Sequence, residues 1–150
     1  MEMDQVVVYN KFQFKLATKI IWDDVIEKIS NEFCNRSHKV VLSNKTGLPT
    51  FVLHNNYYPK SIAEAFNEVN QITNASVLHM YISFAEKSET FGRHSDIEDV
   101  LIVQALGSVS YGFDSDQVVK LDPGDSLHIP RGVYHEPITH GPRVTLSFSW

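Results

Sequence analysis

The second half of the chain, residues 76–150, is built from short β-type segments separated by turns. Apolar and polar residues alternate in residues 78–84 and again in residues 143–150. Alternation with a period of two gives a strand two different faces. Further strands are expected at 100–106, 108–113, 117–121 and 126–129, with turns at 114–116 and 123–125. Many short strands at close spacing predict an antiparallel jelly roll.

The last of these strands predicts how the two sides of its sheet differ. Val144, Leu146, Phe148 and Trp150 form one row, which we expect to face the helices of the first half of the chain. Arg143, Thr145 and Ser147 form the other row, which we expect to point into the interior of the jelly roll.

The first half of the chain mixes helices with strands. Helices are predicted at about 22–35 and 61–72, a strand at 6–9, and a hairpin from 39–43 and 50–54. Ser61 and Glu64 have the spacing of a capping box. The apolar stripe of the first helix is Trp22, Val25, Ile26, Ile29 and Phe33; that of the second is Ile62, Ala65, Phe66, Val69 and Ile72. The fold class predicted is therefore mostly β, with N-terminal helices packed on one face of the jelly roll.

Length and composition limit the possible classes of protein. A chain of 150 residues is the size of one domain, with residues 1–75 as an α/β elaboration and 76–150 as the jelly-roll core. The net charge of −5, without a Lys/Arg cluster, argues against a nucleic-acid partner. The single Cys34 excludes an internal disulfide. No apolar run is long enough for a membrane span and the N-terminus has no signal-peptide pattern, so we expect a cytoplasmic protein.

Two stretches carry the residues of a predicted metal site. His94 and Asp96 precede the apolar run 100–106, and His135 follows the second stretch, 123–132. Residues two apart on a strand point the same way, so His94 and Asp96 are expected to reach one point. Each stretch alone is common in surface loops and turns; both together, in this order, favour a metal site. Two His and one carboxylate form the facial triad that suits Fe(II) and leaves open coordination positions.

The spacing of these residues resembles the paired motifs of the cupin superfamily. The second motif runs Gly124, five residues, Pro130, one residue, Gly132, two residues, His135. The first runs His94-x-Asp96, three residues, Val100, six residues, Gly107. Commoner metal-binding cupins have His at the position of Asp96 and Glu at that of Val100. The pattern here is similar to that of Jumonji-C-like and ribosomal-protein-hydroxylase-like oxygenases. We expect Val100 to face the metal without coordinating it.

This resemblance implies an Fe(II)- and 2-oxoglutarate-dependent oxygenase, a hydroxylase or demethylase. Its partners would be O₂ and an unidentified substrate, either a small molecule or a protein side chain. The nearest families bind the far carboxylate of 2-oxoglutarate with a Lys or Arg at the position of Val109. Arg143 is the candidate replacement, with Thr145 and Ser147 beside it and hydroxyl contacts from Tyr81 and Ser83. The alternative for Arg143 is an exposed residue at the start of a strand.

Two other classes stay open at this point. One is a metal-dependent cupin enzyme that does not use 2-oxoglutarate, which Val109 favours. The other is a non-catalytic cupin binding module. Of the remaining histidines, His128 has the opposite strand parity to Leu127 and Ile129 and is expected to lie outside the metal site. His79 either lines the interior or is a structural residue.

Overall fold

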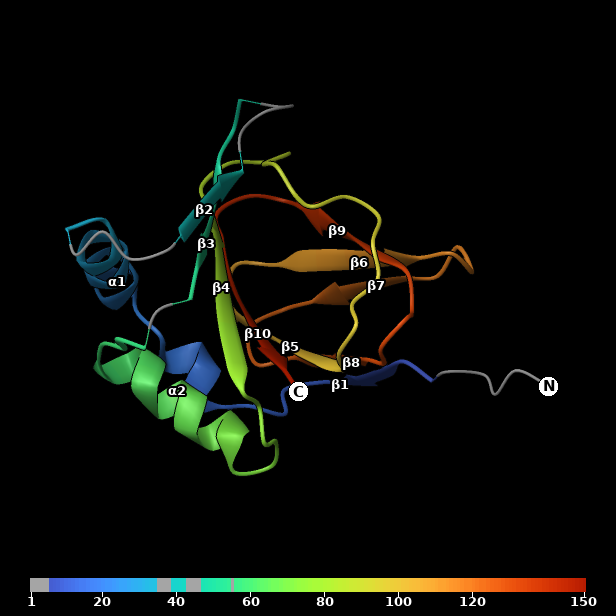
Figure 1. The fold of residues 1–150 in the computed structure, drawn as a ribbon, viewed down its shortest axis with the longest axis horizontal. Helices are drawn as coiled ribbons and strands as arrows, with labels where there is room; N and C mark the ends of the chain where they lie inside the picture. Colours follow the sequence, from blue (N-terminus) through green and yellow to red (C-terminus); the bar gives the residue numbers. More distant parts are fainter. Residues whose placement is uncertain (1–5, 35–38, 43–46, 55) are drawn as a thin grey trace.

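The computed structural model describes residues 6–34, 39–42, 47–54 and 56–150. In these residues two antiparallel sheets face each other, and two α-helices cover the outer face of the larger sheet (Figure 1). The predicted jelly roll with helices packed on one face is therefore confirmed. None of the described helices is long and apolar enough to cross a membrane.

The larger sheet has the strand order β1-β8-β5-β10-β4-β3-β2, and the smaller has the order β7-β6-β9. The strands of the larger sheet are β1 (Val8–Asn10), β8 (Ser126–Ile129), β5 (Val100–Leu106), β10 (Arg143–Ser149), β4 (Val77–Ser83), β3 (Thr50–Leu53) and β2 (Lys39–Leu42). Those of the smaller sheet are β7 (Val118–Leu121), β6 (Val109–Phe113) and β9 (His135–Thr139). The first half of the chain thus adds strands to the larger sheet, including the predicted hairpin of β2 and β3.

The helices differ from expectation in how they begin and in which side chains they bury. They are η1 (Leu16–Lys19), a short 3-10 helix, α1 (Trp22–Cys34) and α2 (Lys60–Asn70). The predicted capping box is wrong, because the N-cap of α2 is Pro59, with no side-chain cap. Ser61 instead donates from its backbone N and its Oγ to Asp24 Oδ2, at 2.9 and 2.5 Å. This contact ties the start of α2 to α1.

The predicted apolar stripes are only partly buried. Val25, Ile62, Ala65 and Val69 are buried, whereas Ile26, Phe33 and Ile72 are exposed. In α1 a charged pair takes the inner positions: Lys28 Nζ lies 3.2 Å from Glu32 Oε1, and both side chains are fully buried. Lys28 Nζ also donates to the Tyr57 carbonyl at 2.8 Å. Pairing and hydrogen bonding offset the desolvation of these charges, so Lys28 and Glu32 can lie on the buried side of α1 with Val25.

Strand β10 separates two interiors, as its alternation predicts. Val144, Leu146 and Phe148 belong to the apolar core between the large sheet and the helices. Trp150 does not join them: it lies beyond the end of β10 and its ring stacks on His128, with centroids 5.8 Å apart. The other row of β10 faces the space between the sheets, where a second apolar cluster includes Val100, Val109 and Tyr111.

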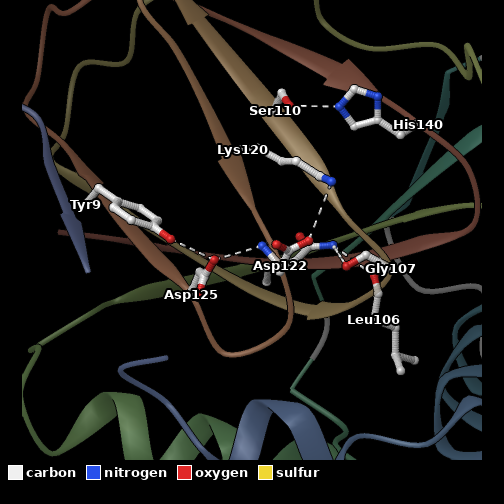
Figure 2. A network of polar contacts seen from close by, with 9 residues as sticks. Tyr9, Leu106, Gly107, Ser110, Lys120, Asp122, Asp125 and His140 are labelled. Carbon is white, nitrogen blue, oxygen red and sulfur yellow. Dashed lines mark hydrogen bonds and ion pairs between the residues drawn. The ribbon is translucent and has the colours of Figure 1, made fainter. Parts of the chain in front are cut away.

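The turn of the second motif is fixed by one buried carboxylate (Figure 2). Asp125 Oδ2 accepts hydrogen bonds from the Tyr9 hydroxyl at 3.0 Å and from its own turn, the Asp122 backbone N, at 2.9 Å. Its Oδ1 accepts from the Phe12 backbone N at 2.9 Å. Gly124 has φ +92°, and a Cβ there would lie 2.9 Å from the Phe12 ring, so a side chain is excluded. These contacts hold β1 against the start of β8.

Candidate metal and anion site

A cavity of about 360 Å³ lies between the two sheets. Its walls come from β3, β4, β5 and β10 of the larger sheet, from β6 and β9 of the smaller, and from the segment 90–98. The polar and aromatic residues that line it are Thr50, His79, Tyr81, Thr90, Phe91, His94, Asp96, Glu98, Tyr111, His135, Arg143, Ser147 and Ser149. All three predicted metal ligands and the predicted anion-binding Arg thus share one cavity.

The three predicted metal ligands converge on one point. One ligand atom from each of His94, Asp96 and His135 lies within 4.8 Å of the other two. His94 Nε2 is 3.9 Å from Asp96 Oδ1, and His135 Nε2 is 3.4 Å from Asp96 Oδ2. The rings of the two His lie 4.4 Å apart between centroids. Two imidazole nitrogens and one carboxylate on one side of a point leave the other side open.

Backbone carbonyls orient the imidazoles of both predicted histidine ligands. His94 Nδ1 lies 2.7 Å from the Gly92 carbonyl, and His135 Nδ1 lies 2.9 Å from the Val133 carbonyl. A carbonyl only accepts hydrogen bonds, so each Nδ1 carries the proton and each Nε2 presents a lone pair. Burial lowers the pKa of His135, which keeps this ring neutral, although its contact with the Val133 carbonyl acts in the opposite direction. This second-nitrogen hydrogen bond is the usual support of a metal-ligating His.

The reason for the convergence differs from the one predicted. His94 forms only an isolated bridge and β5 begins at Val100, so His94 and Asp96 are not on a regular strand. Their segment pairs with the second motif instead: His94 N donates to the His135 carbonyl at 2.9 Å, and His135 N to the His94 carbonyl at 2.8 Å. Gly132 N donates to the Asp96 carbonyl at 2.9 Å. These bonds between the two motifs bring the ligands together.

Val100 and Val109 occupy different places in the space between the sheets. Val100 lines the cavity, beside the segment that carries Asp96, and offers no ligand atom. Val109 is fully buried in the apolar cluster and does not line the cavity. The position at which the nearest families carry a cation is therefore part of the hydrophobic packing in this chain.

Arg143 is buried in the cavity wall, with 2% of its surface exposed, so the alternative of an exposed strand-start residue is excluded. Its Nε donates to Ser83 Oγ at 3.2 Å and its Nη1 to Thr145 Oγ1 at 2.9 Å. Burial lowers the pKa of Arg143, while the Tyr111 and Tyr81 side chains act in the opposite direction. Among the described residues, no carboxylate forms an ion pair with this guanidinium.

The residues predicted around Arg143 fall into two groups. Tyr81 and Ser147 line the cavity, and the Tyr81 ring centroid lies 5.8 Å from the guanidinium carbon. Ser83 and Thr145 are fully buried behind Arg143, outside the cavity lining. They act on Arg143 itself, since both accept its hydrogen bonds.

A wider network fixes this arrangement. Thr145 Oγ1 donates to Gln104 Oε1 at 2.7 Å, and Gln104 Nε2 donates to the Leu106 and Gly107 carbonyls. Gly107 has φ +66°, and a Cβ there would lie 2.0 Å from the Pro142 carbonyl oxygen. The glycine of the first motif therefore permits the close approach of the chain that carries Arg143.

The sequence did not predict Tyr111 as a cavity residue, whereas His79 follows the first of its two predicted alternatives. Tyr111 lines the cavity and was not among the predicted site residues. It lies two residues after Val109 on β6, so the two side chains share one face of the strand, and this spacing could have identified it. Burial raises the pKa of Tyr111 to about 12, so its hydroxyl is protonated at neutral pH. His79 also lines the cavity, and burial and the nearby His54 lower its pKa. His128 lies outside the cavity, 3.3 Å from Asp99 Oδ2 through Nε2.

No protein-family model matches this chain, and no curated protein matches it. Among solved structures it is similar to YcfD, a ribosomal oxygenase from Escherichia coli, in complex with cobalt and succinic acid. The identity is 18% and the TM-score 0.72, over 95% of this chain and 47% of that chain. YcfD in complex with cobalt and 2-oxoglutarate gives 19% and 0.71, over 96% and 47%. A cupin superfamily protein from Desulfitobacterium hafniense gives 18% and 0.47, over 65% and 75%.

The likeness to YcfD confirms, for the fold, the resemblance stated from the motifs. This chain spans about half the length of the YcfD chain, so the likeness concerns one part of that protein.

Proposed function

We propose that this protein is an Fe(II)- and 2-oxoglutarate-dependent oxygenase. The observation that carries the proposal is the pairing, in one cavity, of three converging metal ligands with a buried guanidinium that has no carboxylate partner among the described residues. A metal site alone suits many cupin proteins. A metal site together with an unmatched buried cation suits a cofactor that binds a metal at one end and carries a carboxylate at the other.

The proposed metal ligands are His94, Asp96 and His135. Their donor set, two imidazole nitrogens and one carboxylate, is that of non-haem Fe(II) oxygenases with open coordination positions. Val100 supports the proposal because it places no fourth protein ligand beside them. When bound, iron, 2-oxoglutarate and O₂ would supply the oxidising chemistry. The side chains of this chain would orient the ligands and exclude water.

Arg143 is the proposed partner of the far carboxylate of 2-oxoglutarate. A guanidinium has five N–H groups, and Ser83 and Thr145 accept from two of them. The remaining three have no acceptor among the described residues that the hydrogen bonds show, and Arg143 lines the cavity in which a ligand would bind. A buried cation without a counter-ion is costly, and a bidentate carboxylate would offset that cost. The cation that binds this carboxylate would thus be Arg143 on β10. It would replace the Lys or Arg that the resemblance leads us to expect on β6, at the position of Val109.

The substrate would enter the same cavity, beside the proposed metal position. Phe91 and Ile97 line the cavity and are exposed to solvent, so they lie where a substrate could reach both the cavity and the surface. YcfD is a ribosomal oxygenase, and the likeness of fold favours a protein side chain over a free small molecule as the substrate proposed here.

An anaerobic titration tests the proposal. Fe(II) and then 2-oxoglutarate are added to the protein while the visible spectrum is recorded. We expect a metal-to-ligand charge-transfer band that grows with 2-oxoglutarate and saturates. Succinate, which lacks the 2-oxo group, is the control and should give no such band. Binding of Fe(II) without any band would overturn the proposal and would favour the second candidate, a metal-dependent cupin enzyme that does not use 2-oxoglutarate.

A further inference from the structure

The segment that carries Asp96 lies outside the regular strands. It joins the bridge at His94 to β5, which begins at Val100. The Asp96 carbonyl accepts a hydrogen bond from Gly132 N at 2.9 Å, and the Asp96 side chain is 37% exposed. No strand ladder therefore fixes this ligand, and its position depends on what holds the turn that contains Gly132.

This turn, residues 130–133, presents two consecutive N–H groups to the segment 96–99. Val133 N donates to the Pro130 carbonyl at 3.2 Å and closes the turn, and Gly132 has φ +80°, a value that favours Gly. Arg131 N donates to Asp99 Oδ1 at 3.1 Å, while the next N–H, that of Gly132, donates to the Asp96 carbonyl. The turn of the second motif is thus bonded to both ends of the segment 96–99 of the first.

The Asp99 carboxylate makes further contacts that fix it in place. Its Oδ1 also accepts from Arg131 Nε at 3.0 Å, and its Oδ2 lies 3.3 Å from His128 Nε2. The Arg131 backbone N–H and then the Arg131 side chain lower the pKa of Asp99, so the carboxylate is charged at neutral pH. The backbone of Asp99 exchanges two hydrogen bonds of 3.2 Å with Trp150, the residue after β10. Asp99 therefore connects the end of the larger sheet to the turn.

We propose that Asp99 is a positioning residue of the metal site, because its carboxylate holds the turn 130–133 against the segment 96–99 and so fixes Asp96 relative to His135. This inference rests on the metal site of the proposed function. Asp99 itself neither ligates nor lines the cavity. With the turn in place, His135 Nε2 lies 3.4 Å from Asp96 Oδ2. Without the carboxylate, the Arg131 N–H loses this acceptor and the turn is no longer tied to the segment.

A second acid–Arg pair beside the metal site offers a matched control. Arg93, the neighbour of His94, donates from Nε and Nη2 to the two carboxylate oxygens of Asp114 at 2.7 and 2.5 Å. Both side chains are more than half exposed. The hydrogen bonds of Asp114 come from this side chain and not from a backbone N–H of the turn 130–133. Exposed ion pairs contribute little, so we expect Asp114→Ala to leave the metal site unchanged.

The test is a Co(II) titration of the full chain, followed by visible absorption. In Asp99→Ala we expect about tenfold weaker Co(II) binding and altered ligand-field bands, because Asp96 is displaced from His135. Asp99→Asn keeps an oxygen that can accept from the Arg131 N–H, so it should retain the affinity and the spectrum of the wild type. Arg131→Ala keeps the backbone N–H and should do the same. Asp99→Ser, whose side chain is shorter, replaces Asp99→Ala if that variant does not fold.

Three results would overturn the inference. The first is a wild-type Co(II) affinity and spectrum in Asp99→Ala, even with a lower melting temperature, since Asp99 would then stabilise the fold alone. The second is an equal loss in Asp114→Ala, and the third is a loss in Asp99→Asn as large as in Asp99→Ala.

The proposed function can fail separately from this inference. If the wild type binds Co(II) but gives no charge-transfer band with Fe(II) and 2-oxoglutarate, the proposed function fails, and the Co(II) comparison alone decides the role of Asp99. If the wild type binds no Co(II), both fail.

Discussion

The two ends of the cavity are built in different ways. At the metal end, His94 and His135 are oriented by carbonyls only two residues away in sequence, those of Gly92 and Val133. At the anion end, Arg143 depends in part on distant residues: Ser83 is 60 positions away, and Gln104 is 41 positions from Thr145. Motif spacing can reveal the first arrangement, whereas the second depends on strand register. The following variants separate the two ends.

The largest expected effect is loss of the metal from His135→Ala. This change removes a ligand atom and leaves Asp96 with only one imidazole partner, so we expect at least about 100-fold weaker binding of Co(II). The measurement is a Co(II) titration followed by visible absorption. His140→Ala is the control, since His140 is exposed and pairs with Ser110. Unchanged Co(II) affinity in His135→Ala would mean that the metal binds elsewhere in the protein.

Changes at Arg143 should affect the anion end alone. Arg143→Ala leaves the far carboxylate without its cation, and we expect about 100-fold weaker 2-oxoglutarate binding. Arg143→Lys keeps the charge but loses the bidentate fork, so we expect about tenfold weakening. Co(II) affinity should match that of the wild type in both variants. Loss of Co(II) binding in either would mean that the two ends are not separate.

A fourth ligand at position 100 should change the metal end without removing the metal. In Val100→Glu a carboxylate replaces an apolar side chain on the cavity wall, and we expect it to coordinate and to close one open position. Co(II) should stay bound with an altered visible spectrum, and 2-oxoglutarate should bind more weakly. Val100→Gln has the same size and is a poorer ligand. If both variants give the wild-type spectrum, Val100 does not correspond to the cupin Glu position.

The smallest effect expected is a pH dependence of folding from His79, which also lines the cavity. Burial lowers the pKa of His79, with a further lowering by His54, so the folded protein resists its protonation. Below the ordinary His pKa of about 6.5 the unfolded chain binds more protons, and the metal-free protein should lose stability as the pH falls. His135 acts in the same direction. Urea unfolding at several pH values should show a shallower loss for His79→Gln; an identical slope would exclude His79.

The sequence predicted those features that rest on local pattern. The alternation of residues 143–150 placed Val144, Leu146 and Phe148 against the helices and Arg143 toward the cavity, because strand periodicity fixes the two faces. The same prediction was wrong for Trp150, because this residue lies beyond the end of β10 and stacks on His128. The order and spacing of the motifs likewise predicted that His94, Asp96 and His135 lie close together, as they do.

Features that rest on tertiary contacts were not predictable in this way. Lys28 and Glu32 are buried as an ion pair, and Lys28 also donates to the Tyr57 carbonyl; no helical periodicity indicates these contacts. Ser61 binds Asp24 of the other helix rather than capping its own. Tyr111 and Arg143 line one cavity because the two sheets face each other. Each of these depends on which elements meet, and that information is spread over the whole chain.

The central claim is that one cavity binds a metal and a carboxylate at the same time. A crystal structure with Mn(II) and 2-oxoglutarate, with the metal located by its anomalous scattering, tests it most directly. We predict an anomalous peak between His94 Nε2, His135 Nε2 and the Asp96 carboxylate, with the far carboxylate of 2-oxoglutarate on the Arg143 guanidinium. A peak elsewhere, or a far carboxylate that points out of the cavity while Arg143 stays unmatched, would contradict the account.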